Sequence, residues 1–173
     1  MIILLIGYMG SGKTTVGKKL ADVLDFAFVD LDEYISEKEE SYISSIFDEK
    51  GEIYFRKKES EYLDYILKSS ENLVLALGGG TPCYGENMSY IKNNEQAISF
   101  YIKLPIQDLT NRLMTEKQKR PLIKHMATKD ELTEFIGKHL FERSGFYSEA
   151  DYTINAANKT VEEITEAIVL NLI

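Results

Sequence analysis

The sequence contains little cysteine, proline and arginine, and it has no tryptophan. Its one cysteine, Cys83, has no partner in the chain for a disulfide and cannot supply a thiolate-rich zinc site. These absences indicate a reducing compartment, so we expect the protein to be cytoplasmic. With only three prolines and no run rich in serine, proline or glycine, the 173 residues offer no clear boundary, and we expect a single domain, residues 1–173.

A long apolar run and an excess of positive charge are also absent. The opening run, Ile2 to Ile6, is too short for a transmembrane helix and lacks the basic flank of a signal peptide. Lysine and arginine total 20 against 28 aspartate and glutamate residues, and the formal net charge is −8. Because an acidic surface gains nothing by displacing the counterions of a polyanion, we expect neither nucleic acid nor a membrane as partner.

Short apolar runs alternate with longer amphipathic stretches, a pattern typical of βαβ units and a parallel sheet. We predict five strands, at residues 2–6, 26–30, 73–77, 97–102 and 151–154. The first four are almost continuously apolar, as expected when helices cover both faces of the sheet. The sequence therefore predicts an α/β fold with three layers, α/β/α, around a central parallel sheet. Two segments, 31–60 and 116–128, interrupt the rhythm and are interpreted as mobile inserts.

The strongest pattern is the segment 7–14, Gly-Tyr-Met-Gly-Ser-Gly-Lys-Thr, which satisfies G-x-x-x-x-G-K-[ST]. It lies between the first predicted strand and a predicted helix, as the pattern requires. Its glycines let successive N–H groups turn towards phosphate oxygens, and the following helix adds the positive end of its dipole. A chance match is expected in roughly one chain of this length in a hundred. The segment therefore predicts a phosphate-binding loop.

The end of this loop predicts contacts with a nucleotide and its metal. We expect Lys13 to reach the β- and γ-phosphates and the Thr14 hydroxyl to bind Mg²⁺. The predicted ATP-binding residues of the loop are Gly10, Ser11, Gly12, Lys13, Thr14 and Thr15.

The second predicted strand ends in Asp30-Leu31-Asp32, at the edge of the sheet where ligands bind. Asp30 is a candidate for a water ligand of Mg²⁺, and Asp32 is a candidate to orient an attacking hydroxyl. The alternative is that one of the two aspartates caps a helix beginning at Glu33. The neighbouring phosphate loop favours the functional interpretation.

Three consecutive glycines, Gly78, Gly79 and Gly80, follow the third predicted strand at the same edge. Glycine permits close approach of the backbone to a small ligand. A tight turn is the alternative, but one glycine would suffice for it.

Only four arginines are available to bind anions on this acidic chain. Arg143 continues the apolar stripe of its predicted helix, so it needs a partner, either a substrate carboxylate or an acid such as Glu59. Arg120 lies in the charged segment 116–128, either as an ordinary surface residue or on a lid that closes over the γ-phosphate. Arg112 precedes this segment on a predicted helix, where it either binds an anion or is simply solvated. The two histidines have no partner at metal-ligand spacing and are interpreted as non-catalytic.

The order and spacing of these elements resemble the shikimate kinases, small P-loop enzymes related in fold to the nucleoside monophosphate kinases. The resemblance spans essentially the whole chain and rests on segment 7–14, Asp30-Leu31-Asp32, Phe55-Arg56 with Glu59, Gly78-Gly79-Gly80, Arg120-Pro121-Leu122, and Arg143 with Tyr147. It implies a P-loop fold with a mobile lid and transfer of the γ-phosphate of ATP to the 3-hydroxyl of shikimate in aromatic amino-acid biosynthesis. Mg²⁺ would be the cofactor, and the protein would be a monomer.

The resemblance also implies roles at the acceptor side. Arg56 and Arg143 would hold the shikimate carboxylate, with Glu59 holding Arg56. Asp32 would bind the ring hydroxyls and serve as base or orienter. The implied substrate-binding set is Asp32, Arg56, Gly78, Gly79, Gly80 and Arg143, within a binding region at about 31–60.

At the nucleotide side, the resemblance implies that Lys13 and Arg120 stabilise the transferring phosphoryl group and are catalytic together with Asp32. Thr14 and Asp30 would serve Mg²⁺, Arg112 would lie against the adenine, and the lid would span about 116–128. Residues 155–159 depart from the family, because the arginines often found there beside the adenine are replaced by Asn-Ala-Ala-Asn-Lys.

Two other functions fit the residues less well. One is a P-loop kinase for another small anion, such as gluconate or a nucleoside monophosphate, although a monophosphate acceptor would demand more arginines than four. The other is a nucleotide-binding module without catalysis, which would have no need of Asp32.

Overall fold

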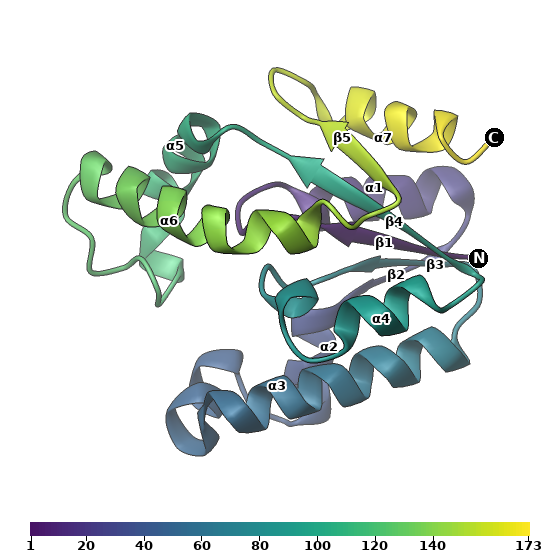
Figure 1. Cartoon of the computed structure of the whole chain (residues 1–173), viewed down its shortest axis with the longest axis horizontal. Helices are drawn as coiled ribbons and strands as arrows, with labels where there is room; N and C mark the ends of the chain where they lie inside the picture. Colours follow the sequence, from purple (N-terminus) through teal and green to yellow (C-terminus); the bar gives the residue numbers. More distant parts are fainter.

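The computed structural model describes residues 1–173 and contains one five-stranded parallel sheet between two layers of helices (Figure 1). The strands are β1 (Ile2–Ile6), β2 (Ala27–Asp30), β3 (Leu73–Ala76), β4 (Ala97–Lys103) and β5 (Tyr152–Asn155). Their order in the sheet is β2-β3-β1-β4-β5. The predicted α/β fold and all five predicted strands are confirmed, with ends that differ by no more than about one residue.

The helices are α1 (Lys13–Leu24), α2 (Leu31–Lys38), α3 (Ile43–Ser69), α4 (Asn87–Lys92), α5 (Ile106–Glu116), α6 (Lys129–Tyr147) and α7 (Val161–Leu170), with short 3₁₀ turns at η1 (Thr81–Cys83) and η2 (Lys117–Lys119). Figure 1 shows α1 and α7 on one face of the sheet, α3 and α4 on the other, and α5 and α6 beyond the carboxyl ends of the strands. None of the helices combines the length and apolar composition needed to cross a membrane.

The central strand β1 carries the phosphate loop. All five of its residues are fully buried, and it pairs in parallel with β3 on one side and β4 on the other. Strand β2 pairs with β3, with Asp30 opposite Ala76. Because all of these strands run the same way, the segments that follow β1, β2 and β3 meet at one edge of the sheet. The candidate site residues that follow these strands therefore lie at that edge.

The segment 31–60, which we interpreted as a mobile insert, has regular secondary structure. Most of it lies in α2 and in the first part of α3, which is bent at Gly51 (φ 83°, ψ 168°), a backbone conformation open only to glycine. The Glu39 carboxylate accepts hydrogen bonds from the Tyr54 hydroxyl at 2.6 Å and the Tyr62 hydroxyl at 2.7 Å, so it holds the end of α2 against α3. The two-turn length of α2 and the break at Gly51 hide the helical period from the sequence.

Candidate active site

A pocket of about 470 Å³ opens at the carboxyl edge of the sheet. Its walls come from the phosphate loop after β1, the end of β2, the glycine segment after β3, and α5 with the residues that follow it. The lining residues are Met9, Gly10, Gly12, Lys13, Thr14, Thr15, Asp30, Asp32, Glu33, Leu77, Gly78, Gly79, Arg112, Glu116 and Arg120. The structure thus brings most of the predicted nucleotide-binding residues to one polar cavity.

The phosphate loop is shaped by backbone conformations that favour glycine. Gly10 has φ 78° and Gly12 has φ 94°, and Gly12 immediately precedes the first residue of α1. No side chain caps this helix, so its first N–H groups remain available to an anion. The Lys13 ammonium donates to the carbonyls of Gly7 at 2.8 Å and Tyr8 at 3.0 Å, which places it over the loop. The predicted phosphate site is therefore built as the motif requires.

Ser11 lies apart from the other loop residues. It is buried, its hydroxyl has no hydrogen-bond partner, and it is absent from the pocket wall. Its backbone N–H donates to the carbonyl of Tyr8 at 3.2 Å. Ser11 consequently supports the turn of the loop from beneath.

Lys13 and Asp32 both have pKa values shifted towards neutrality. Burial lowers the pKa of Lys13 to about 8, although the charges of Asp32 and Asp30 oppose the shift. Burial also raises the pKa of Asp32 to about 6, and the carboxylates of Asp30 and Glu59 add to the effect. Strongly shifted groups in one pocket are a physical signature of a reactive site. An ammonium and a carboxylate of this kind suit charge stabilisation and proton transfer.

Asp30 caps α2 and also contacts the phosphate loop. One carboxylate oxygen caps α2 by accepting from the N–H groups of Asp32 at 3.0 Å and Glu33 at 3.4 Å. The other oxygen accepts from the Thr14 hydroxyl at 2.8 Å. The cap is thus Asp30 and not Asp32, and the helix begins at Leu31, two residues earlier than the capping alternative assumed. Asp32 is left free to face the pocket.

The pair Thr14 and Asp30 fits Mg²⁺. Both offer hard oxygen atoms, which this ion prefers, and no group of three acidic, histidine or cysteine side chains forms a closed metal cage. Mg²⁺ is commonly held by one or two protein oxygens together with substrate phosphates and water. The donor set therefore suits a metal that arrives with a nucleotide.

Each glycine of the segment 78–80 lies against a different predicted site residue. A Cβ at Gly78 would lie 2.9 Å from Oδ1 of Asp32. At Gly79 it would lie 3.4 Å from Nη1 of Arg143, and at Gly80 it would lie 2.8 Å from Nη2 of Arg56. The segment is therefore more than a tight turn, because it brings one carboxylate and two guanidinium groups from three helices against a single stretch of backbone.

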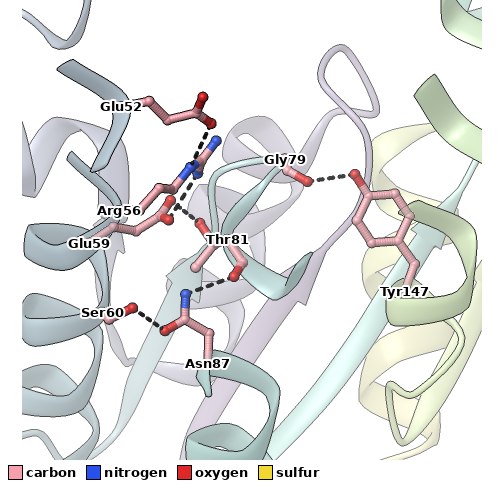
Figure 2. Close-up of polar contacts among 8 residues, drawn as sticks. All are labelled: Glu52, Arg56, Glu59, Ser60, Gly79, Thr81, Asn87 and Tyr147. Carbon is pink, nitrogen blue, oxygen red and sulfur yellow. Dashed lines mark hydrogen bonds and ion pairs between the residues drawn. The ribbon is translucent and has the colours of Figure 1, made fainter. Parts of the chain in front are cut away.

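Arg56 is held from several directions (Figure 2). Its Nη1 donates to Oε2 of Glu59 at 2.9 Å, and its Nε lies 3.5 Å from the exposed Glu52. Its guanidinium carbon lies 3.8 Å from the centre of the Tyr84 ring, within the range of a cation–π interaction. Burial alone would lower the pKa of Arg56, but the Glu59 carboxylate raises it above its ordinary value. The guanidinium is charged and oriented before any substrate arrives.

Arg143 has no ion-pair partner in the protein. The structural alternative, a salt bridge with Glu59 or another acid, is absent, since no carboxylate lies within 4.0 Å of its guanidinium nitrogens. One turn further along α6, the Tyr147 hydroxyl donates to the carbonyl of Gly79 at 2.6 Å (Figure 2). Helix α6 thus fixes the glycine segment while it presents an uncompensated cation beside it.

Two further arginines lie on the nucleotide side of the pocket. Arg112 donates to the carbonyl of Gly10 at 3.2 Å, and Arg120 donates to Glu116 at 2.9 Å, one helical turn earlier. The segment 116–128 contains η2 and a series of turns, and two of its own side chains, Ile123 and Met126, are buried. Residues 155–159 do not line the pocket.

Sequence reasoning missed several residues that shape the site. Tyr84 stacks on Arg56, Thr81 contacts Glu59, and Glu116 holds Arg120. The ring of His139 accepts from or donates to the Tyr8 hydroxyl at 2.9 Å, which links α6 to the phosphate loop. Only the spacing of Glu116 and Arg120, four residues apart on one helical turn, was visible beforehand. The others depend on tertiary packing.

A phosphate loop at the carboxyl end of β1, with a carboxylate and cations around a second subsite, defines a P-loop kinase of small molecules. Comparison with known proteins narrows this class. Residues 9–172 match the family model described as shikimate kinase. A shikimate kinase of Flavobacterium psychrophilum is 45% identical over 166 residues, covering 96% of this chain and 95% of that protein.

Solved structures agree with the sequence comparison. A crystal structure of shikimate kinase from Bacteroides thetaiotaomicron has a TM-score of 0.90 and 35% identity, covering 99% of this chain and 98% of that one. Shikimate kinase from Acinetobacter baumannii in complex with shikimate has a TM-score of 0.88 and 31% identity, covering 99% and 92%. The chain belongs to the shikimate kinase family.

Proposed function

We propose that the protein transfers the γ-phosphoryl group of ATP to the 3-hydroxyl of shikimate, which yields ADP and shikimate 3-phosphate for aromatic amino-acid biosynthesis. The observation that carries this proposal is the convergence of Asp32, Arg56 and Arg143 on the segment 78–80, beside a formed phosphate loop. Family membership and the relative in complex with shikimate support the choice of acceptor.

The acceptor is held by its carboxylate and its hydroxyls. Arg56 and Arg143 flank the glycine segment and supply two guanidinium groups, of which only Arg56 is already ion-paired. A carboxylate matches this arrangement because guanidinium groups bind carboxylates with paired hydrogen bonds. The backbone of Gly79 and Gly80 approaches the ring without side chains in the way. Asp32 then receives the ring hydroxyls.

Lys13 and Asp32, which both line the pocket, have separate roles in phosphoryl transfer. Asp32 orients the 3-hydroxyl and accepts its proton as the new bond to γ-phosphorus forms and the bond to the β–γ bridging oxygen breaks. Lys13 and Arg120 stabilise the negative charge on the transferring group. Thr14 and Asp30 would hold Mg²⁺, which would neutralise the phosphate charge when bound with ATP. Thr15 and the glycines of the loop complete the phosphate site, and Ser11 supports the turn that shapes it.

Segment 116–128 acts as a lid that carries Arg120 onto the nucleotide. Water would otherwise compete with the acceptor hydroxyl, so closure protects the reaction. The exposed Glu116–Arg120 pair exchanges for a contact with phosphate, and Arg112 lies beside the adenine. The support is the position of Arg120 on the pocket wall, directly after η2. Amide hydrogen exchange in 116–128 should slow when ATP analogue and shikimate are both bound, and unchanged exchange would remove the lid.

The decisive experiment measures ADP release from Mg-ATP with shikimate, gluconate, AMP or no acceptor, each repeated with Arg56→Ala. We expect turnover with shikimate alone and a large loss of it in Arg56→Ala. Turnover with gluconate or AMP would support kinase activity but reject shikimate as the acceptor. ATP binding without acceptor-dependent ADP release from folded protein would support a non-catalytic module.

We also propose the setting in which the enzyme works. The chain acts as a single domain and a monomer in the cytoplasm, with ATP and shikimate as its partners. One lone cysteine, an acidic surface and a site completed by one chain's own residues support this description. Sedimentation of the purified protein tests the monomer.

A further inference from the structure

We propose that Thr81 and Asn87 are positioning residues for the acceptor arginine, and that they act by fixing the carboxylate of Glu59. This inference rests on the proposed function, because it assumes that Arg56 binds the acceptor carboxylate. Neither residue lines the pocket, and both are completely buried. They lie in η1 and α4, and Thr81 directly follows the glycine segment 78–80 (Figure 2).

Glu59 is the centre of the arrangement. Its side chain is 1% exposed, and its two oxygens are divided between two donors. Oε2 accepts from Arg56 at 2.9 Å, and Oε1 accepts from the Thr81 hydroxyl at 2.7 Å. A buried carboxylate is costly unless its oxygens are satisfied. The Thr81 hydroxyl therefore fixes the direction in which Glu59 presents its other oxygen to Arg56.

Asn87 in turn fixes Thr81. Its amide nitrogen donates to the Thr81 carbonyl at 2.8 Å, and its amide oxygen accepts from the Ser60 hydroxyl at 2.7 Å. Ser60 is the neighbour of Glu59 on α3. The four residues therefore form a closed circuit from α3 through η1 and α4 back to α3 (Figure 2). Every polar group of this buried circuit is paired, which gives it one well-defined geometry.

The circuit and the seat of Arg56 share one stretch of backbone. Gly80, which precedes Thr81, lies against the Arg56 guanidinium, and Tyr84, just after η1, stacks on it. Nη2 of Arg56 donates to no protein acceptor, whereas Nη1 and Nε have carboxylate neighbours. A change in the angle of Glu59 would therefore turn the unengaged edge of the guanidinium away from the acceptor. Thr81 and Asn87 act on affinity for the acceptor through this angle.

The main test is Thr81→Val, which keeps the shape of the side chain and removes the hydroxyl. We expect the Kd and KM for shikimate to rise about tenfold, with the KM for ATP unchanged. Thr81→Ser keeps the hydroxyl and should restore the wild-type values. The matched control is Thr165→Val, because Thr165 is 3% exposed and its hydroxyl donates only to its own helix, to the Val161 carbonyl at 2.8 Å. A purely structural role would lower the Tm of both variants without a selective change in shikimate affinity.

A double-mutant cycle with Arg56→Ala tests whether Thr81 acts through Arg56. In the Arg56→Ala background, Thr81→Val should cause no further loss of shikimate affinity. An equal loss in both backgrounds, or a Thr81→Val enzyme that matches Thr165→Val, overturns the inference. If Thr81→Val fails to fold, Ser60→Ala opens the circuit at a half-buried position and should raise the shikimate Kd about threefold, and an unchanged Kd overturns the inference instead.

The same measurements separate this inference from the proposed function. A wild-type enzyme without shikimate-dependent ADP release, or an Arg56→Ala enzyme with normal affinity for shikimate, defeats the function itself. If the affinity for shikimate falls in Arg56→Ala but does not change in Thr81→Val, only the positioning role is rejected.

Discussion

The nucleotide side and the acceptor side of the pocket are built in different ways. The phosphate loop is a local structure: its glycines, Lys13 and Thr14 are consecutive in sequence and follow the central strand. The acceptor side is assembled from α2, α3, the segment 78–80 and α6, which meet only in the folded chain. A phosphate is recognised mainly by backbone N–H groups, whereas a small carboxylic acid is recognised by side chains that other side chains must hold.

Substitutions should therefore behave differently on the two sides. Substitutions on the nucleotide side should lower kcat and the affinity for ATP together, since the same groups bind phosphate and stabilise its transfer. Damage on the acceptor side should separate affinity for shikimate from affinity for ATP. The following predictions test this division.

The largest effect is expected at Asp32, where the two sides meet. Asp32→Asn removes the proton acceptor but keeps the size of the side chain, and it should lower kcat by about a thousandfold. The dissociation constant of ATP should stay within about threefold of wild type, because Asp32 is proposed to contact the acceptor and not ATP. Steady-state kinetics and calorimetry measure the two quantities. Near-normal turnover would remove Asp32 from the mechanism.

The next effect sharpens the acceptor side. Gly80 has φ −91° and ψ −16°, which alanine adopts without strain, so Gly80→Ala should fold normally. The new Cβ would lie 2.8 Å from Nη2 of Arg56 and displace the guanidinium from Glu59. We expect the KM for shikimate to rise on the order of thirtyfold. The KM for ATP and the Tm are the internal controls, and a rise in both KM values would break the proposed division.

The difference between the two sides also explains how much could be predicted from the sequence. The five strands, Lys13, Thr14 and the approach of Asp30 to the phosphate loop follow from local patterns and from the rule that parallel strands end at one edge. The pairing of each glycine in 78–80 with its own partner could not be predicted, because it depends on where α3 and α6 cross that edge. Tyr84 and Thr81 carry no motif, since their contacts span tertiary structure.

The pH dependence of the reaction rate should report on Asp32 at the acceptor side and on Lys13 at the nucleotide side. The kcat/KM for ATP should fall below pH 6, where Asp32 gains a proton, and above pH 8, where Lys13 loses one. At about pH 5 the loss should be about tenfold, because one pH unit below a pKa leaves about a tenth of the group ionised. In the profile of kcat the alkaline limb should move to higher pH, since bound phosphates stabilise the Lys13 ammonium. Initial rates across the pH range test this. If the alkaline limbs of the kcat and kcat/KM profiles superimpose, Lys13 does not contact the bound nucleotide.

The smallest expected effect comes from a glycine outside both subsites. Gly137 lies inside α6, and a Cβ there would meet its nearest neighbour, Ile106, at 3.9 Å, an ordinary contact. Gly137→Ala should therefore raise the free energy of unfolding by about 0.5–1 kcal/mol through lower chain entropy in the unfolded state. Both KM values should stay unchanged, unlike in Gly80→Ala. Urea denaturation and steady-state kinetics of the two variants test whether the effect of Gly80→Ala is specific. Each variant adds one methyl group, which should change stability in α6 but acceptor binding at the glycine segment.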